Sequence, residues 1–173
     1  MKAPIAETTE HRVVGRPPAG EHCFGCKEGP SECLGLRVYR LDDGSVMSLV
    51  KTKESHQSFH GIVHGGIVCS YLDEVLSYNT WTGDTCDSIA MTVEMTIKYF
   101  ASVPVNTEIR VVGDPPRIER RNYYISGRIL LPDDTIAATA DIHYVKLRPE
   151  DERNALESVA RTARAPLCDS LTF

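Results

Sequence analysis

One strongly apolar helical segment lies in the middle of a chain whose other regular segments have the alternating pattern of β-strands. From Gly65 to about Thr80, apolar side chains recur at helical spacing and form a wide face, namely Ile67, Val68, Tyr71, Leu72, Val75 and Leu76. A single hairpin cannot bury such a helix, whereas an antiparallel sheet built from both sides of it can. The pattern therefore predicts an α+β fold in which about five to six antiparallel strands wrap around one long central helix.

The strands are predicted from apolar and polar residues that alternate between turn signals. They cover residues 34–41 and 45–51 before the helix, and residues 91–100, 107–112, 123–131 and 135–147 after it. Alternate residues from Met91 to Tyr99 are apolar, so we expect one face of that strand in the core. Outside the strands, we expect a flexible N-terminal arm over residues 1–22, one domain over residues 23–148, and a short C-terminal helix and frayed tail over residues 149–173.

Composition fits one soluble domain and excludes several classes of protein. With 173 residues, 42% apolar and 25% charged, the chain resembles an ordinary globular protein. Its formal net charge of −5 argues against a protein that binds nucleic acid by neutralising phosphates. No apolar run approaches the ~20 residues that span a membrane, and the first residues lack the apolar core of a signal peptide. We therefore expect a cytoplasmic protein that binds neither nucleic acid nor membranes.

Three of the six cysteines cluster near the N-terminus, at Cys23, Cys26 and Cys33. The Cys23-x2-Cys26 spacing is half of a zinc site, and Cys33 together with His22 or His11 would be needed to complete it. The other interpretation is that all three are structural thiols, since disulfide frameworks are rare in a reducing compartment. The pattern favours structural thiols, so we expect no metal site and no cofactor.

The segment that leads into the helix ends in His64-Gly65-Gly66. Two glycines at a helix start leave backbone N–H groups uncovered and let a ligand approach closely. Those N–H groups, at the positive end of the helix dipole, suit a developing oxyanion. The same three residues also fit a plain glycine-rich helix start, so the motif alone does not predict a site.

Asp73 lies inside the apolar helix, on one stripe with Cys69 and Ser77. A partly buried carboxylate there could act as a general base or a nucleophile, whereas the alternative is that Asp73 and Glu74 mark the solvent side of the helix. Gly65 and Asp73 are about 12 Å apart along one helix, too far to act on one carbonyl group. Two antiparallel copies would bring Gly65 of one subunit to Asp73 of the other, so a site here implies a twofold dimer.

His64-Gly65-Gly66 with Asp73 in the following helix resembles the hotdog-fold acyl-CoA thioesterases of the 4-hydroxybenzoyl-CoA thioesterase superfamily, most closely the phenylacetic-acid-degradation type. The run over residues 91–100, followed by Pro104, is similar to the family's strand after the helix. Cys23-Phe24-Gly25-Cys26 before Gly35-Leu36 also occurs in members with an N-terminal arm. The resemblance covers about residues 23–148. It implies a hotdog fold that hydrolyses the thioester of acyl-CoA or of acyl carrier protein to a carboxylic acid and a free thiol.

The resemblance also implies roles for single residues. Asp73 corresponds to the carboxylate that activates water or attacks the thioester, and Thr92 to a hydroxyl that holds the water near it. Gly65, with His64 beside it, corresponds to the backbone N–H that polarises the carbonyl from the other subunit. Gly66 follows in the same motif, and Ser77 matches a hydroxyl position one turn beyond the carboxylate in a related branch.

Two further groups of residues follow from the resemblance. Many relatives carry Asn or Gln six residues before the histidine of the motif, where this chain has Ser58; the adjacent Gln57 could take that role, or the assistance to the carbonyl is weaker. Coenzyme A, which would enter as part of the substrate, carries phosphates and so calls for a basic patch. Its candidates are Arg117, Arg120 and Arg121, with Lys98, Lys146 and Arg148. A solvated hairpin end explains each of these charges equally well.

Two other functions compete with thioester hydrolysis. A non-catalytic or weakly active acyl-CoA-binding protein is consistent with Ser58. An enoyl-CoA hydratase is ranked lower, because families of that kind use Asp-x4-His and no Asp of this chain has a His five positions later. In the leading hypothesis, the partners are the thioester substrate and a second copy of the chain, and two such dimers could pair into a tetramer.

Overall fold

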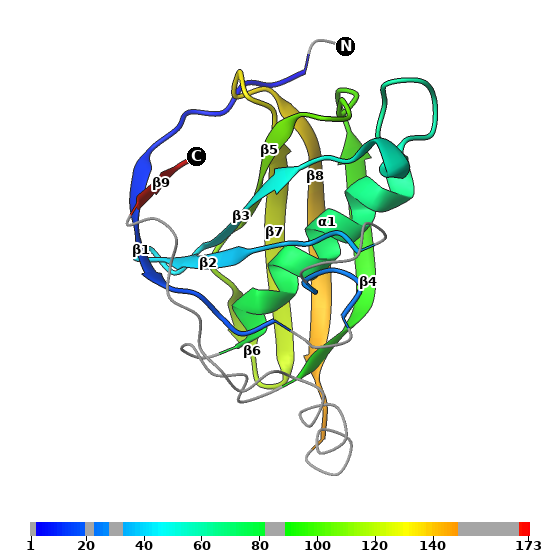
Figure 1. Ribbon diagram of the computed structural model, residues 1–173. Helices are drawn as coiled ribbons and strands as arrows, with labels where there is room; N and C mark the ends of the chain where they lie inside the picture. Colours follow the sequence, from blue (N-terminus) through cyan, green and yellow to red (C-terminus); the bar gives the residue numbers. More distant parts are fainter. Residues whose placement is uncertain (1–2, 20–22, 28–32, 82–88, 149–169) are drawn as a thin grey trace.

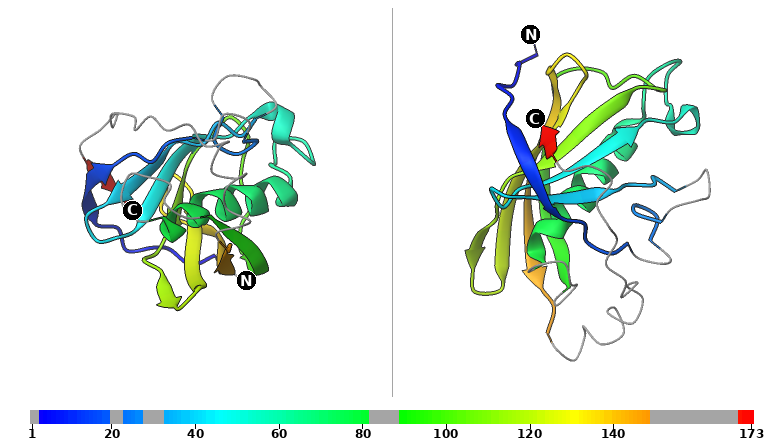
Figure 2. Two further views of the ribbon diagram at one scale, coloured as in Figure 1. Left: turned by 90° about the horizontal axis from the view of Figure 1, so that it is seen from below. Right: turned by 60° about the vertical axis from the view of Figure 1, so that its left-hand side comes forward.

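One helix packs across the concave face of a large antiparallel sheet. The computed structural model describes residues 3–19, 23–27, 33–81, 89–148 and 170–173. The helix, α1 (Gly65–Ser77), continues into a short 3-10 helix at Tyr78–Thr80 and crosses the sheet in Figure 1, while Figure 2 shows it lying against one side of the strands. This is the predicted α+β hotdog arrangement. No helix within the described ranges is long and apolar enough to cross a membrane.

The strands form one sheet whose members pair antiparallel. They are β1 (Glu10–Gly15), β2 (Val38–Leu41), β3 (Val46–Lys51), β4 (Ala90–Tyr99), β5 (Glu108–Gly113), β6 (Arg117–Glu119), β7 (Asn122–Leu130), β8 (Ile136–Lys146) and β9 (Ser170–Thr172). Their hydrogen-bonded order is β4-β8-β7-β5-β3-β2-β1-β9, and β6 pairs with β7. The ten-residue strand β4 is therefore the edge at one end of the sheet, with β8 as its neighbour.

The apolar face of α1 explains why the helix is fixed on the sheet. Its buried side chains are Val68, Tyr71, Leu72, Val75 and Leu76. Each contributes about 1.5–3 kcal/mol when it leaves water. The approach to β7 is close enough that a Cβ added at Gly127 would lie 2.6 Å from a Leu76 methyl carbon and 2.5 Å from the Val112 carbonyl oxygen. Only glycine fits where the helix meets the middle of the sheet.

Both chain termini differ from the predicted flexible arm and frayed tail. Within residues 1–22, Glu10–Gly15 form β1, which pairs with β2 and with β9 near the C-terminus. Figure 2 shows β1 and β9 side by side. The ring of Phe173 stacks on His11 at 4.5 Å between ring centres. The described residues thus form nine strands rather than five or six, because the terminal strands β1 and β9 pair with each other and the short strand β6 pairs with β7. The helix predicted within residues 149–173 lies outside the described residues.

The exposure of β4 also differs from the prediction of one core face. Met91, Val93 and Tyr99 are 55%, 61% and 52% exposed, whereas Ala90, Met95 and Ile97 are half-buried against the core. Among the described residues, no strand pairs with the outer side of β4. A long apolar edge of this kind is a template for pairing with another strand.

The packing of the C-terminus predicts a specific stability loss. Phe173 is 5% exposed and lies in an apolar cluster with Tyr39, Leu41 and Leu171. Phe173→Ala should lower the free energy of unfolding by about 3 kcal/mol, because the cavity adds to the lost burial. Urea denaturation measures the change. In the control Val14→Ala, at a half-exposed position of β1, the change should stay within about 0.5 kcal/mol. Equal effects of the two substitutions would contradict the observed docking of the C-terminus.

Candidate active site

Asp73 lies on the face of α1 that is turned towards β4. Its Oδ1 accepts a hydrogen bond of 2.7 Å from the hydroxyl of Thr92, near the start of β4. One turn earlier on the helix, the sulfur of Cys69 contacts the sulfur of Met95 at 3.5 Å. The predicted stripe therefore faces the edge strand, and Asp73 is half-buried with one oxygen held by a hydroxyl. A carboxylate in this position is suited to act as a general base on a water molecule.

The backbone at Asp73 is fixed as firmly as its side chain. The hydroxyl of Tyr144, on β8, donates to the Asp73 carbonyl oxygen at 2.9 Å. Burial first, and then the charge of Asp73, raise the pKa of Tyr144, so this hydroxyl stays protonated and remains a donor. Two strands thus hold the residue: β8 through its backbone and β4 through its carboxylate.

Gly65 lies at the opposite end of the helix, where α1 begins. The ring Nδ1 of His64 accepts the N–H of Gly66 at 2.9 Å and so caps the helix. Among the described residues no acceptor contacts the N–H of Gly65, while its carbonyl oxygen accepts from the hydroxyl of Tyr99 at 3.0 Å. Of the two glycine N–H groups proposed as oxyanion donors, the one at Gly65 is therefore open and the one at Gly66 is used by the cap.

A pocket of about 390 Å³ opens beside Gly65. Ser58 and Tyr99 line it together with apolar side chains such as Val68. Gln57, the predicted substitute for the missing amide, has its Oε1 bonded to the Gly61 N–H at 3.2 Å, within its own loop. Ser58 rather than Gln57 therefore borders the space next to the open N–H.

Strand β4 connects the two halves of the candidate site without bringing them together. Its start bonds to Asp73 through Thr92, and its end bonds to Gly65 through Tyr99. The two groups thus lie along one open edge of the molecule, about 12 Å apart along the helix axis. Within one chain, a single carbonyl group cannot contact both.

The remaining predicted site residues do not touch Asp73. The hydroxyl of Ser77 donates to the Glu74 carbonyl oxygen at 2.7 Å, so it serves the helix backbone. Arg120, with a φ of 57°, and Arg121 form the turn between β6 and β7. The guanidinium of Arg121 donates to the carbonyl oxygen of Lys146 at the end of β8. That turn therefore lies at the Thr92 end of the sheet, because Lys146 pairs with Ala90.

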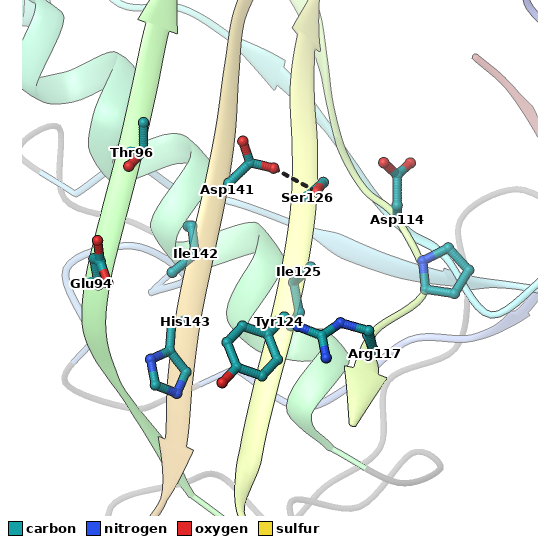
Figure 3. A pocket seen from close by; sticks show the side chains of 11 residues that line it. Glu94, Thr96, Asp114, Arg117, Tyr124, Ile125, Ser126, Asp141, Ile142 and His143 are labelled. Carbon is teal, nitrogen blue, oxygen red and sulfur yellow. Dashed lines mark hydrogen bonds between the residues drawn. The ribbon is translucent and has the colours of Figure 1, made fainter. Parts of the chain in front are cut away.

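A second hollow, of about 520 Å³, lies on the face of the sheet away from α1 and contains none of the predicted catalytic residues. Figure 3 shows His143, Tyr124 and Arg117 next to one another across β8, β7 and β6. The rings of His143 and Tyr124 stack at 4.6 Å, and the Arg117 guanidinium lies 4.1 Å from the centre of the Tyr124 ring. Arg117 also pairs with Glu119, so its charge is partly satisfied within this face.

A cluster beside α1 was missed by reasoning from sequence. Glu74 is not on the solvent side of the helix; its Oε1 lies 3.1 Å from the sulfur of Cys23. Burial first, and then the neighbouring Cys23 sulfur, raise the pKa of Glu74 to about 8. Cys33, which a zinc site at this cysteine pair would have needed, has its carbonyl oxygen bonded to Lys53 and is outside the cluster. His11 lies instead near Asp42 and Asp43, and His22 lies outside the described residues.

His56 is the second residue that the sequence did not single out. It is 6% exposed, its Nδ1 lies 3.1 Å from the hydroxyl of Tyr71 on α1, and its carbonyl oxygen accepts the N–H of His64 at 2.8 Å. Its Nε2 is buried without a hydrogen-bond partner among the described residues. Burial lowers the pKa of His56 below its ordinary value, which favours the neutral ring. Through its contacts with Tyr71 and His64, this residue positions the segment that leads into α1.

Comparison with known proteins agrees with this architecture. The model of the thioesterase superfamily matches residues 60–138, just under half of the chain, and includes both Gly65 and Asp73. The acyl-coenzyme A thioesterase THEM4 of Mus musculus is 30% identical over 95 residues. These residues are 54% of this chain and 40% of the mouse protein, so the chain spans well under half the length of that relative.

Solved structures share the fold at lower identity. A thioesterase superfamily protein, RHA08564, has a TM-score of 0.64 at 24% identity, over 72% of this chain and 60% of its own. PaaI from the E. coli phenylacetic acid degradation operon has a TM-score of 0.59 at 15% identity, over 68% and 83%. The protein smu.793 from Streptococcus mutans, solved bound to acetyl CoA, has a TM-score of 0.55 at 15% identity, over 65% of this chain and 88% of its own. These likenesses show the hotdog fold, and the narrower phenylacetic-acid-degradation type stays a prediction.

The buried His56 predicts a pH dependence of stability. The unfolded chain binds a proton at this ring near the ordinary pKa of 6.5, whereas the folded chain does so at a lower pH. The contribution of neutral His56 is therefore complete above about pH 6.5 and is lost as the pH falls through the folded value. His56→Gln should flatten the fall of the free energy of unfolding between about pH 7 and pH 5. His60→Gln, at an exposed position of the same loop, serves as the control. Parallel pH curves for His56→Gln and the unmodified chain would show that His56 titrates normally.

Proposed function

We propose that this chain is a member of the thioesterase superfamily and hydrolyses the thioester of an acyl-CoA, or of an acyl carrier protein, to a carboxylic acid and a free thiol. One observation carries the proposal: the half-buried carboxylate of Asp73, in the apolar helix, is held at 2.7 Å by Thr92 at the open edge of the sheet. The open N–H of Gly65 at the helix start supplies the complementary donor.

In the proposed reaction, Asp73 takes a proton from a water molecule while the water oxygen attacks the carbonyl carbon of the thioester. The carbonyl oxygen becomes an oxyanion, which the N–H of the partner subunit's Gly65 stabilises at the positive end of its helix. Collapse of this intermediate breaks the carbon–sulfur bond and releases the thiolate, which receives the proton from Asp73. Thr92 keeps the carboxylate oriented and supports the water.

The proposed site is shared between two copies because one helix cannot supply both groups to one carbonyl. An antiparallel pairing of two β4 strands about a twofold axis at Met95 or Thr96 brings Thr92 near the partner subunit's Tyr99, and both side chains lie on the helix face of the sheet. Thr92 is bonded to Asp73, and Tyr99 is bonded to Gly65, so this pairing brings the two catalytic groups together. The exposed apolar side chains of β4 supply the interface.

The class of substrate is supported by the relatives. The mouse relative is named an acyl-coenzyme A thioesterase, and the protein from Streptococcus mutans binds acetyl CoA. In this chain, Arg120 and Arg121 lie in a turn at the Thr92 end of the sheet, where they would contact the phosphates of coenzyme A. The reaction itself uses a carboxylate and backbone N–H groups.

A non-catalytic acyl-CoA-binding protein is the second candidate. It is favoured by one observation: Ser58, and not an amide side chain, lines the pocket beside Gly65. A panel of acyl-CoA thioesters separates the two functions, because an enzyme releases free thiol from a bound ester. Tight binding with no thiol release would favour the binding protein.

Replacing the carboxylate of Asp73 tests the mechanism. Asp73→Asn keeps the size of the side chain but removes the general base, so kcat should fall by roughly 10²–10⁴-fold with little change in KM. Thr92→Val should give a smaller loss, because Thr92 only positions the carboxylate and the water. Steady-state kinetics on the best thioester of the panel measure both.

The matched control for this test is Asp141→Asn. Asp141 also accepts a hydrogen bond from a hydroxyl, that of Ser126 at 2.6 Å, but it lies on the other face of the sheet. Its replacement should leave kcat unchanged. Near-normal kcat in Asp73→Asn would mean that Asp73 is only a polar helix residue.

A charge on the exposed edge tests the dimer. Val93 is 61% exposed and lies on β4, whereas Ile118 is 54% exposed and lies on β6. Val93→Lys should change the free energy of unfolding of the isolated chain little, because the side chain is exposed there. In the proposed interface it would bury a charge, so it should shift the protein towards monomer and reduce kcat. Ile118→Lys should change neither. Sedimentation velocity with parallel activity assays measures both, and a fully active monomer would refute the shared site.

A further inference from the structure

Two cysteines and a glutamate that the proposed reaction does not use converge beside α1. The sulfurs of Cys23 and Cys26 and a carboxylate oxygen of Glu74 all lie within 4.8 Å of one another. Cys26 is 3% exposed, and the other two side chains are partly buried. The group combines the N-terminal loop with the middle of the helix, and Glu74 directly follows Asp73.

The loop is shaped around the sulfur of Cys23. The N–H groups of Gly25 and Cys26 point to this sulfur at 3.2 and 3.3 Å, and the Cys23 carbonyl oxygen accepts the N–H of Lys27 at 3.1 Å. Backbone N–H groups directed at a sulfur favour the thiolate, which is the form that binds metals. The turn therefore presents an anionic sulfur without rearrangement.

The position of Glu74 against this turn is set by the backbone. A Cβ added at Gly25 would lie 2.4 Å from the carboxyl carbon of Glu74, so no larger residue fits there with the carboxylate in place. On its other side the turn is anchored, because the N–H of Leu34 donates to the Phe24 carbonyl oxygen and that of Leu36 to the Gly25 carbonyl oxygen, each at 2.9 Å. The carboxylate is thus held against the two sulfurs between a fixed loop and a fixed helix.

We propose that Cys23, Cys26 and Glu74 bind one divalent cation of the zinc class. Two thiolates and one carboxylate match the ligands that zinc prefers, at a tetrahedral site whose fourth ligand is a solvent molecule. A divalent cation would also neutralise the negative charge of two thiolates and a carboxylate that lie within 4.8 Å of one another. Such a cation would fasten the N-terminal loop to α1, one residue from Asp73, and takes no part in the hydrolytic step.

The proposal departs from the expectation of purely structural thiols for a specific reason. The residue that joins the cysteine pair is Glu74, which is separated from Cys23 by 51 positions, whereas Cys33 and His11 lie outside the cluster. The metal-site proposal does not depend on the proposed hydrolysis, because its test measures metal binding directly.

The experiment titrates the reduced, metal-free full chain with Co²⁺ and follows the absorption spectrum. One Co²⁺ per chain should bind, with a thiolate-to-cobalt charge-transfer band and the visible bands of tetrahedral cobalt, and Zn²⁺ should bleach both. Because changes outside the ligand shell already cost about 10–100-fold, Cys26→Ser and Glu74→Gln should weaken binding by on the order of 100-fold or more. Gly25→Ala, which keeps all three ligands but displaces Glu74, should weaken binding by about 10-fold.

The matched control is Cys33→Ser, which removes a neighbouring thiol outside the cluster and should leave the titration unchanged. Circular dichroism establishes that each variant is folded, and Gly25→Ala supplies the test if removal of a ligand prevents folding. The proposal is overturned if the reduced chain shows no charge-transfer band, if the band survives unchanged in Glu74→Gln and Gly25→Ala, or if Cys33→Ser abolishes it. A Cys23–Cys26 disulfide that re-forms in the presence of Co²⁺, with no metal bound, would also overturn it.

Discussion

The packing of α1 against the sheet is the contact on which both functional hypotheses depend. Five apolar side chains bury one face of the helix against the strands, and Gly127 lets it approach β7 closely. Once that face is fixed, the rest of the helix has no freedom to rotate. Asp73 must then point to the edge strand β4, and Glu74, one residue further, must point to the N-terminal loop. Two adjacent acidic residues thereby acquire separate environments.

The open edge of the sheet and the two separated halves of the candidate site both lie along strand β4. The helix is covered by the sheet only as far as β4, whose outer groups and apolar side chains remain exposed. The same strand carries Thr92 at the carboxylate and Tyr99 at the open N–H. Pairing of two such edges would cover the apolar surface and join the halves of the site. Dimerisation and catalysis would then depend on the same strand, which explains why a charge at Val93 is expected to affect both.

The sequence predicts the central parts of this structure because they are long and periodic. The helix from Gly65 and the strands of the core belong to segments whose pattern is local. The nearness of Thr92 to the Asp73 carboxylate is predicted only by the family resemblance. Strands β1 and β9 escape prediction because they are only six and three residues long and gain their stability from pairing with each other across the whole chain.

Other features cannot be read from a sequence for a different reason. Alternation along β4 indicates an apolar face but does not say whether the chain or a partner covers it. The contact of Glu74 with Cys23, and the buried position of His56 against Tyr71, arise from tertiary packing and leave no local signal.

A mixed-dimer experiment tests the shared site most directly. Gly65→Pro removes the proposed donor N–H at the first helical position, where proline is tolerated, and the extended backbone of His64 suits a following proline. Asp73→Asn and Gly65→Pro chains should each be inactive alone. Refolded together, half of the dimers are mixed and each has one intact site, so about a quarter of the unmodified activity should return. Activity that stays at the level of the separate variants would place Asp73 and Gly65 in the same chain's site and contradict the account.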